Sequence, residues 1–158
     1  MSGDVTKVET SIGHCVSQDL HMNEGVAKQI KEKFGRIEEL KEQKVEVGGV
    51  AILKIGPGRY IYNLVTKEKY SGKPTYQSIR ESLKEMSMHC IDNSFDVISM
   101  PRIASGRDKM EWKEIHEMLN ELFKSIDIEI RIYTLDEEEI SQDWGEPGED
   151  NILQSIHL

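Results

Sequence analysis

The sequence has few cysteines and no long apolar run, and each shortage excludes a class of protein. The two cysteines among its 158 residues, Cys15 and Cys90, lie far apart and belong to no Cys-x-x-Cys pair or Cys/His cluster. Both have apolar neighbours, so we expect buried free thiols, no disulfide and no zinc or other metal site. No apolar stretch approaches the roughly 20 residues that span a bilayer, and the N-terminus lacks the apolar run of a signal peptide. We therefore expect an intracellular protein, in the nucleus, the cytoplasm or both, without a membrane partner.

Positive charge is also scarce. Twenty Lys and Arg residues face 29 Asp and Glu residues, which gives a formal net charge of -9 at pH 7. Long-range electrostatic forces do not draw such a chain to nucleic-acid backbones, so we expect no nucleic-acid partner. A local basic site for a phosphate ligand stays possible. The length suits one domain with a real core, and we expect a monomer.

Predicted strands and helices alternate along the first 135 residues. Apolar and β-branched runs predict strands over 10–17, 50–55, 59–66, 96–100 and 128–132. Helical spacing of apolar residues predicts helices over 25–34, 37–43 and 111–125, and a further helix that starts at Pro74. A Gly-Pro-Gly turn at 56–58 makes residues 50–66 an antiparallel hairpin. The order predicts an α/β fold, a mixed sheet with helices on both faces.

The chain changes character at Asp136. Residues 136–158 are acidic and have little to bury, which predicts a flexible C-terminal tail after a domain over 1–135. The last residues, 152–158, are either a short docking segment or a frayed terminus.

A candidate ligand site lies in the stretch from Ser99 to Trp112, which reads as a strand end, a loop of small residues and a helix start. Ligands bind at such junctions because backbone N–H groups and the helix N-terminus point into the crevice. Asp108 has two interpretations. With Glu111 it has the form of a capping box, which is the more common role, and it is also placed to act as a general acid or base or to orient a ribose hydroxyl.

Lys73 is the second candidate for chemistry. Most lysines are solvated surface residues, but Pro74 holds Lys73 extended directly before a predicted helix. An unprotonated amine is the nucleophile that attacks a masked aldehyde. Two small loops, 23–25 and 104–106, are either ordinary turns or cradles whose N–H groups contact a phosphate or ribose.

Ordered motifs over Gly3 to Leu135 together resemble the macrodomain family, an ADP-ribose-binding fold with three layers, α/β/α. The resemblance is to its terminal ADP-ribose protein glycohydrolase branch. The motifs are Gly3-Asp4, His14-Cys15-Val16-Ser17 with Asp19, Met22 and Gly25, Lys33-Phe34-Gly35, Arg59-Tyr60-Ile61-Tyr62, Lys73-Pro74-Thr75-Tyr76, Ser99-Met100-Pro101-Arg102-Ile103 through Asp108 and Trp112, and Ile132-Tyr133-Thr134-Leu135.

The resemblance implies a hydrolase that removes ADP-ribose from carboxylate side chains of mono-ADP-ribosylated proteins and deacylates O-acyl-ADP-ribose, without a cofactor. Lys73 would be the nucleophile that attacks the distal ribose, and Asp108 would assist proton transfer and resolve the adduct. Asp4 would accept a hydrogen bond from the adenine amino group. The residues that would line the diphosphate and ribose are Ser17, Gly25, Ile103, Ala104, Ser105 and Gly106.

Some positions depart from the family pattern. Glu24 places a carboxylate near the expected diphosphate, which it would repel. Ala104 adds a methyl group where the backbone approaches the ligand, and it adopts a positive φ less easily than glycine. The first strand of the family is expected to be missing, which exposes a sheet edge or leaves a gap. These departures support the alternative of a non-catalytic ADP-ribose reader or a degenerate family member.

Overall fold

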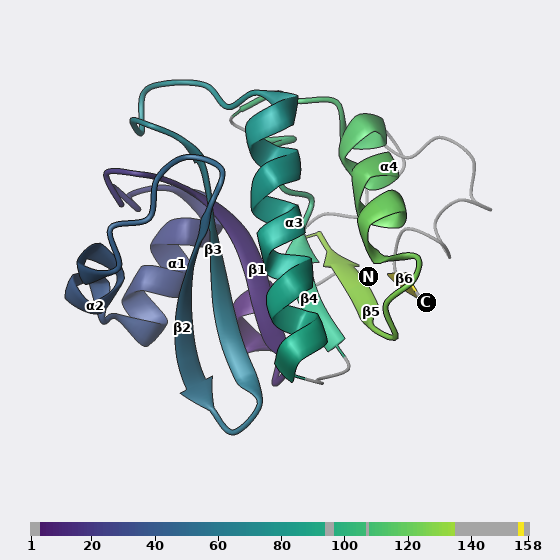
Figure 1. Cartoon of the computed structure of the whole chain (residues 1–158). Helices are drawn as coiled ribbons and strands as arrows, with labels where there is room; N and C mark the ends of the chain where they lie inside the picture. The colour runs from purple at the N-terminus through teal and green to yellow at the C-terminus, as the bar shows by residue number, and fades with distance from the viewer. Residues whose placement is uncertain (1–3, 94–96, 107, 135–154, 157–158) are drawn as a thin grey trace.

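The computed structural model describes residues 4–93, 97–106, 108–134 and 155–156 (Figure 1). They form a short 3-10 helix over Val5–Lys7, then strand β1 (Ser11–Ser17), helices α1 (Gly25–Phe34) and α2 (Ile37–Glu42), and strands β2 (Val50–Gly56) and β3 (Arg59–Lys67). Helix α3 (Tyr76–Asn93), strand β4 (Val97–Pro101), helix α4 (Trp112–Phe123), strand β5 (Glu129–Tyr133) and strand β6 (Ser155–Ile156) follow.

One mixed sheet holds all six strands, in the order β2-β3-β1-β4-β5-β6. The four inner strands, β3, β1, β4 and β5, are parallel to one another, while β2 pairs antiparallel with β3 and β6 antiparallel with β5. The predicted hairpin is therefore confirmed. The carboxyl ends of the four parallel strands meet at one edge of the sheet, which is where ligand sites form in such folds.

Helices cover both faces of the sheet, so the α/β/α arrangement is confirmed. In Figure 1, α3 and α4 lie on one face and α1 and α2 on the other. The face under α3 and α4 buries a large apolar cluster, in which Leu83, Met86, Ile115, Leu119 and Phe123 are fully buried. A second cluster under α1 and α2 contains residues of β1, β2 and β3. At about 25 cal/mol per Å² of buried apolar surface, these two layers are the main stabilising contribution of the fold.

Helix α3 begins later than predicted. Pro74 was expected at its first position, but the helix starts at Tyr76 and Thr75 caps it. The Ser78 N–H donates to Oγ1 of Thr75 at 2.9 Å, and the Thr75 N–H donates to Oγ of Ser78 at 3.0 Å. This reciprocal pair satisfies two backbone donors at the helix start, which fixes the end of the preceding loop.

The capping prediction for Asp108 is wrong. Helix α4 begins at Trp112, and its N-cap residue, Glu111, makes no side-chain capping hydrogen bond. The Glu111 N–H instead donates to the hydroxyl of Tyr76 at 3.1 Å. The carboxylate of Asp108 is engaged elsewhere, with a lysine at the end of β3.

The outer edge of β5 is paired at Ile130 and Arg131, opposite Ile156 and Ser155 of β6. This edge is therefore not open at those positions. The expected flexible tail falls mostly outside the described residues, since 135–154 and 157–158 are not among them.

Candidate functional site

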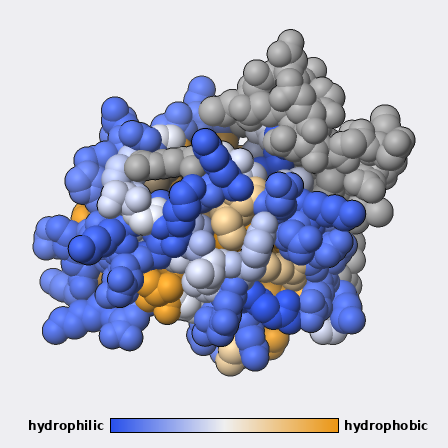
Figure 2. Space-filling model, turned by 90° about the horizontal axis from the view of Figure 1, so that it is seen from above, coloured by the Kyte–Doolittle hydropathy of each residue, from blue (hydrophilic) through white to orange (hydrophobic). Residues whose placement is uncertain are grey.

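A cavity of about 310 Å³ opens at the carboxyl ends of β1, β3 and β4, and we call it the Asp108 cavity. It lies between the start of α1 and the loop that follows β4. Its lining includes three residues predicted from the loop after β4, Ile103, Ala104 and Gly106, together with Ser17, Gly25 and Asp108. Figure 2 looks down on this edge of the sheet, where pale and apolar surface lies between hydrophilic margins. The volume is within the range of about 300–1,000 Å³ that small-molecule sites occupy.

An ion pair lies at the wall of this cavity. Nζ of Lys67, the last residue of β3, lies 2.8 Å from Oδ1 of Asp108. The two side chains are only 9% and 12% exposed. A buried charge needs a partner of opposite charge, and Lys67 and Asp108 are each other's partner. The pair therefore fixes the Asp108 carboxylate at the ends of the central strands.

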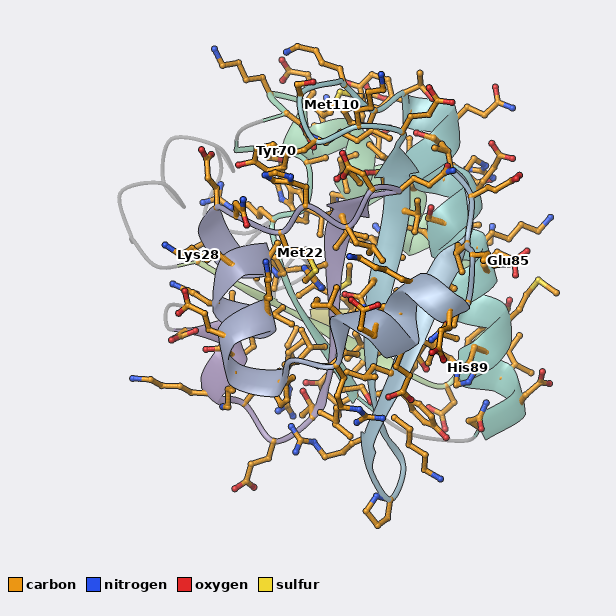
Figure 3. The ribbon with its side chains drawn as sticks, turned by 90° about the vertical axis from the view of Figure 1, so that its left-hand side faces the viewer. Met22, Lys28, Tyr70, Glu85, His89 and Met110 are labelled. Atoms are coloured by element: carbon orange, nitrogen blue, oxygen red, sulfur yellow. The ribbon has the colours of Figure 1, made fainter. Side chains whose placement is uncertain are left out.

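Asp19 ties the loop after β1 to the loop after β3. Its carboxylate accepts hydrogen bonds from the Ser17 hydroxyl and from the N–H groups of His21 and Tyr70. Burial raises the pKa of Asp19, but these hydrogen bonds outweigh it and hold the pKa below its usual value. The centroid of the Tyr70 ring lies 4.8 Å from the centroid of the His21 ring and 5.9 Å from Nζ of Lys67. In Figure 3, Tyr70 lies above Met22, beside the upper end of α1, where both line the cavity.

The backbone of the loop after β4 adopts a left-handed turn at Ala104, with φ of 59°. Alanine therefore adopts this conformation here, although it does so less easily than glycine. The Met110 N–H donates to the Ala104 carbonyl at 2.8 Å, and the Ser105 hydroxyl donates to the Ile103 carbonyl at 3.1 Å. Such internal hydrogen bonds hold the strained turn in place.

Three predicted site residues lie outside the Asp108 cavity. Ser105 bonds back to its own loop and does not line the cavity. Asp4 caps the first 3-10 helix, where Oδ1 accepts from the Thr6 N–H at 2.9 Å and from the Thr6 hydroxyl at 2.6 Å. These hydrogen bonds lower the pKa of Asp4. The third residue is Lys73. The functional roles predicted for Lys73, Asp4 and Ser105 stay predictions.

Lys73 lines a neighbouring cavity of about 660 Å³, which we call the Lys73 cavity. It is bounded by the loop over 68–75 and by the loop over 46–47. Thr66 and Lys67 line both cavities. The two predicted catalytic residues therefore line different cavities rather than one pocket.

Two groups of β1, the buried His14 and the half-buried Cys15, border the Asp108 cavity, so the expectation of a buried thiol holds for Cys90 and not for Cys15. Burial lowers the pKa of His14 to about 4, although a hydrogen bond with Asn63 opposes this shift. The Asn63 amide nitrogen donates to the Ala51 carbonyl at 3.1 Å, so its oxygen faces Nε2 of His14, 2.6 Å away. Nε2 therefore carries the proton of a neutral ring. Burial, together with the nearby Asp108 charge, raises the pKa of Cys15 to about 12, so its thiol stays protonated.

Comparison with known proteins places this arrangement in a family. The family model described as Macro domain matches residues 14–119.

The chain belongs to the macrodomain family.

Relatives of this macrodomain include the human ADP-ribose glycohydrolase OARD1, which is 45% identical over 125 residues and covers 79% of this chain and 82% of the human protein. The solved macrodomain of Thermus aquaticus DarG is 21% identical, with a TM-score of 0.76 over 85% of this chain and 95% of that one. Thermosipho africanus DarTG, solved in complex with ADP-ribose, is 14% identical, with a TM-score of 0.72 over 83% of this chain and 39% of its own.

The macrodomain's described residues contain no group of three or more His, Cys, Asp or Glu side chains that could hold a metal ion. Within the same residues, no helix is long and apolar enough to cross a membrane.

Sequence reasoning missed Lys67 and Tyr70. The sequence did hold a signal for Lys67, because this lysine directly follows the strand predicted over 59–66. A lysine at the carboxyl end of such a strand is placed at the site edge of a parallel sheet.

Proposed function

We propose that this macrodomain hydrolyses the ester between ADP-ribose and the carboxylate side chains of modified proteins, and that it also deacylates O-acyl-ADP-ribose. The position of Asp108 carries the proposal. Its carboxylate is nearly buried, lines a cavity of ligand size at the carboxyl ends of the strands, and does not cap the helix that follows. The 45% identity to a human ADP-ribose glycohydrolase supports the same reaction class.

Lys73 and Asp108 act in two successive steps of the proposed reaction. The amine nitrogen of Lys73 attacks the anomeric carbon of the distal ribose, so a C–N bond forms and the C–O bond to the departing carboxylate breaks. Asp108 then takes a proton from a water that attacks the same carbon. The new C–O bond displaces the amine, Asp108 releases the proton to solvent, and free ADP-ribose is the product. Hydrolysis of an acyl ester of the same sugar gives the free acid and ADP-ribose.

A second candidate function is an ADP-ribose reader without turnover. One observation favours it: Lys73, the proposed nucleophile, lines the neighbouring cavity instead of the Asp108 cavity. A reader needs only the cavity and its backbone donors.

The test uses the full chain and a peptide that carries ADP-ribose on one glutamate. Chromatography measures free ADP-ribose, and calorimetry measures ADP-ribose binding separately. We expect Lys73→Ala and Asp108→Ala each to lower turnover by about 100-fold or more, the usual contribution of such groups. Lys84→Ala, an exposed residue of α3, is the matched control and keeps the wild-type rate.

The outcomes separate the candidates. Wild-type turnover by Lys73→Ala would remove Lys73 from the mechanism. Binding of ADP-ribose without turnover by the wild type would establish the reader, and no binding would contradict both functions.

A further inference from the structure

We propose that the Lys73 cavity is the acceptor subsite, where the polypeptide that carries the modified carboxylate lies during the reaction. This inference rests on the proposed hydrolase function and names the part of the substrate that a second site on this chain takes. The Asp108 cavity holds the ADP-ribose group and the Lys73 cavity holds the modified protein segment.

The shared wall of the two cavities carries the first step of the argument. Lys67 lines both, and its ammonium group is bonded to Asp108 on the side of the smaller cavity. A distal ribose that contacts Asp108 therefore lies at the junction of the two cavities. The group attached to the anomeric carbon of this ribose then lies beside the larger Lys73 cavity, which has a volume of about 660 Å³.

The walls of the Lys73 cavity are held from both sides. On one side, the Val47 N–H donates to Oε1 of Gln18 at 3.1 Å, and the Gly48 N–H donates to the Val65 carbonyl at 2.8 Å. On the other side, the Tyr70 N–H donates to Asp19, and the Gly72 N–H donates to the Lys69 carbonyl at 2.9 Å. The cavity is thus formed before a ligand arrives, which lowers the ordering cost of binding.

The charges in this cavity suit a polypeptide. Lys69 and Lys73 line it together with Glu46 and Glu68, so its lysines and glutamates balance. The third lysine, Lys67, has its charge offset by Asp108. A polypeptide with mixed side chains and backbone amides is matched by such a polar lining of balanced charge.

The experiment compares two substrates of the full chain. One is a peptide with ADP-ribose on a glutamate, and the other is acetyl-ADP-ribose, whose acyl group is too small to fill the second cavity. Ser71→Trp places an indole on the cavity wall, and Ser125→Trp is the matched control, an exposed serine after α4 that does not line the cavity. A second variant, Lys69→Glu, changes the charge of the wall without adding bulk, and Lys124→Glu is its control.

We expect Ser71→Trp to lower the ratio of kcat/KM for the peptide to kcat/KM for acetyl-ADP-ribose at least tenfold, mainly through KM. Lys69→Glu lowers the same ratio for a peptide with acidic residues beside the modified glutamate, and neither control changes it. Equal losses on both substrates, or weaker calorimetric binding of free ADP-ribose to Ser71→Trp, would mean that this cavity holds part of ADP-ribose and would overturn the proposal. Absence of turnover of either substrate by the wild type would overturn the hydrolase function itself, and the subsite with it.

Discussion

The ion pair between Lys67 and Asp108 makes a quantitative prediction. Replacing Lys67 by methionine keeps an unbranched apolar stem but removes the ammonium that lies 2.8 Å from the Asp108 carboxylate. At that separation the attraction is about 6 kcal/mol for an effective dielectric constant of about 20. The cost of desolvating both groups cancels much of this when the pair forms. Removing one partner instead leaves a charged group nearly buried and alone, which costs about 3–5 kcal/mol.

We therefore expect Lys67→Met to lower the free energy of unfolding by about 3–5 kcal/mol, and Tm by about 6–20 °C for a chain of this size. Urea unfolding at pH 7 of Lys67→Met, Asp108→Asn and the double variant measures the coupling between the two residues. The double variant should lose less than the sum of the single losses, since it buries no unpaired charge. Arg80→Met is the matched control, because Arg80 pairs with Glu121 on the exposed surface and its loss should leave the transition in place. A loss below about 1 kcal/mol for Lys67→Met, or additive losses, would refute a buried and coupled pair.

Three further predictions concern single residues. The pKa of about 4 for His14 lies below the 6.5 of an unfolded histidine, so the unfolded chain binds the extra proton first. The free energy of unfolding therefore falls by about 3 kcal/mol as the pH drops from 6.5 to 4. Urea unfolding of a His14→Gln variant at several pH values should lack this part of the pH dependence. The pKa of about 12 for Cys15 predicts that iodoacetamide at pH 8 modifies it at least tenfold more slowly in the folded protein than in urea, as followed by peptide mass spectrometry, and equal rates would contradict this. Ala104→Gly should raise the free energy of unfolding by about 0.5–1 kcal/mol. The φ of 59° costs alanine about 1–2 kcal/mol, and the greater entropy of glycine in the unfolded chain offsets part of the gain. A lower Tm in a thermal melt of the variant would contradict the strain.

Periodicity predicted the elements of the fold because their apolar faces are strongly patterned. Helix α4 was predicted from Trp112, Ile115, Leu119, Leu122 and Phe123, all of which except the half-buried Leu122 are buried against the sheet. The hairpin of β2 and β3 was predicted from its Gly-Pro-Gly turn, which local backbone chemistry determines. Helix starts were less predictable, since Thr75 rather than Pro74 caps α3 through a hydroxyl contact that spacing alone does not reveal.

The location of the candidate site could be predicted from the sequence, but the side-chain contacts within it were less predictable. The loop after β4 and the start of α1 lie at the carboxyl ends of parallel strands, and topology brings Ile103, Gly106 and Gly25 to one cavity. Which lysine contacts Asp108 depends on a separation of 41 residues in the chain and on the register of β3. A local pattern holds no information on such a contact, which is why the sequence pointed to Lys73 while Lys67 forms the ion pair.

A crystal structure of the full chain with ADP-ribose tests the central claim most directly. We expect the diphosphate along the lining formed by Ser17, Gly25, Ile103, Ala104 and Gly106, and the distal ribose beside Asp108 with its anomeric carbon facing Lys67 and the Lys73 cavity. An ADP-ribose molecule bound in the opposite direction, with adenine beside Asp108, or bound outside the Asp108 cavity would contradict both the site and the proposed reaction.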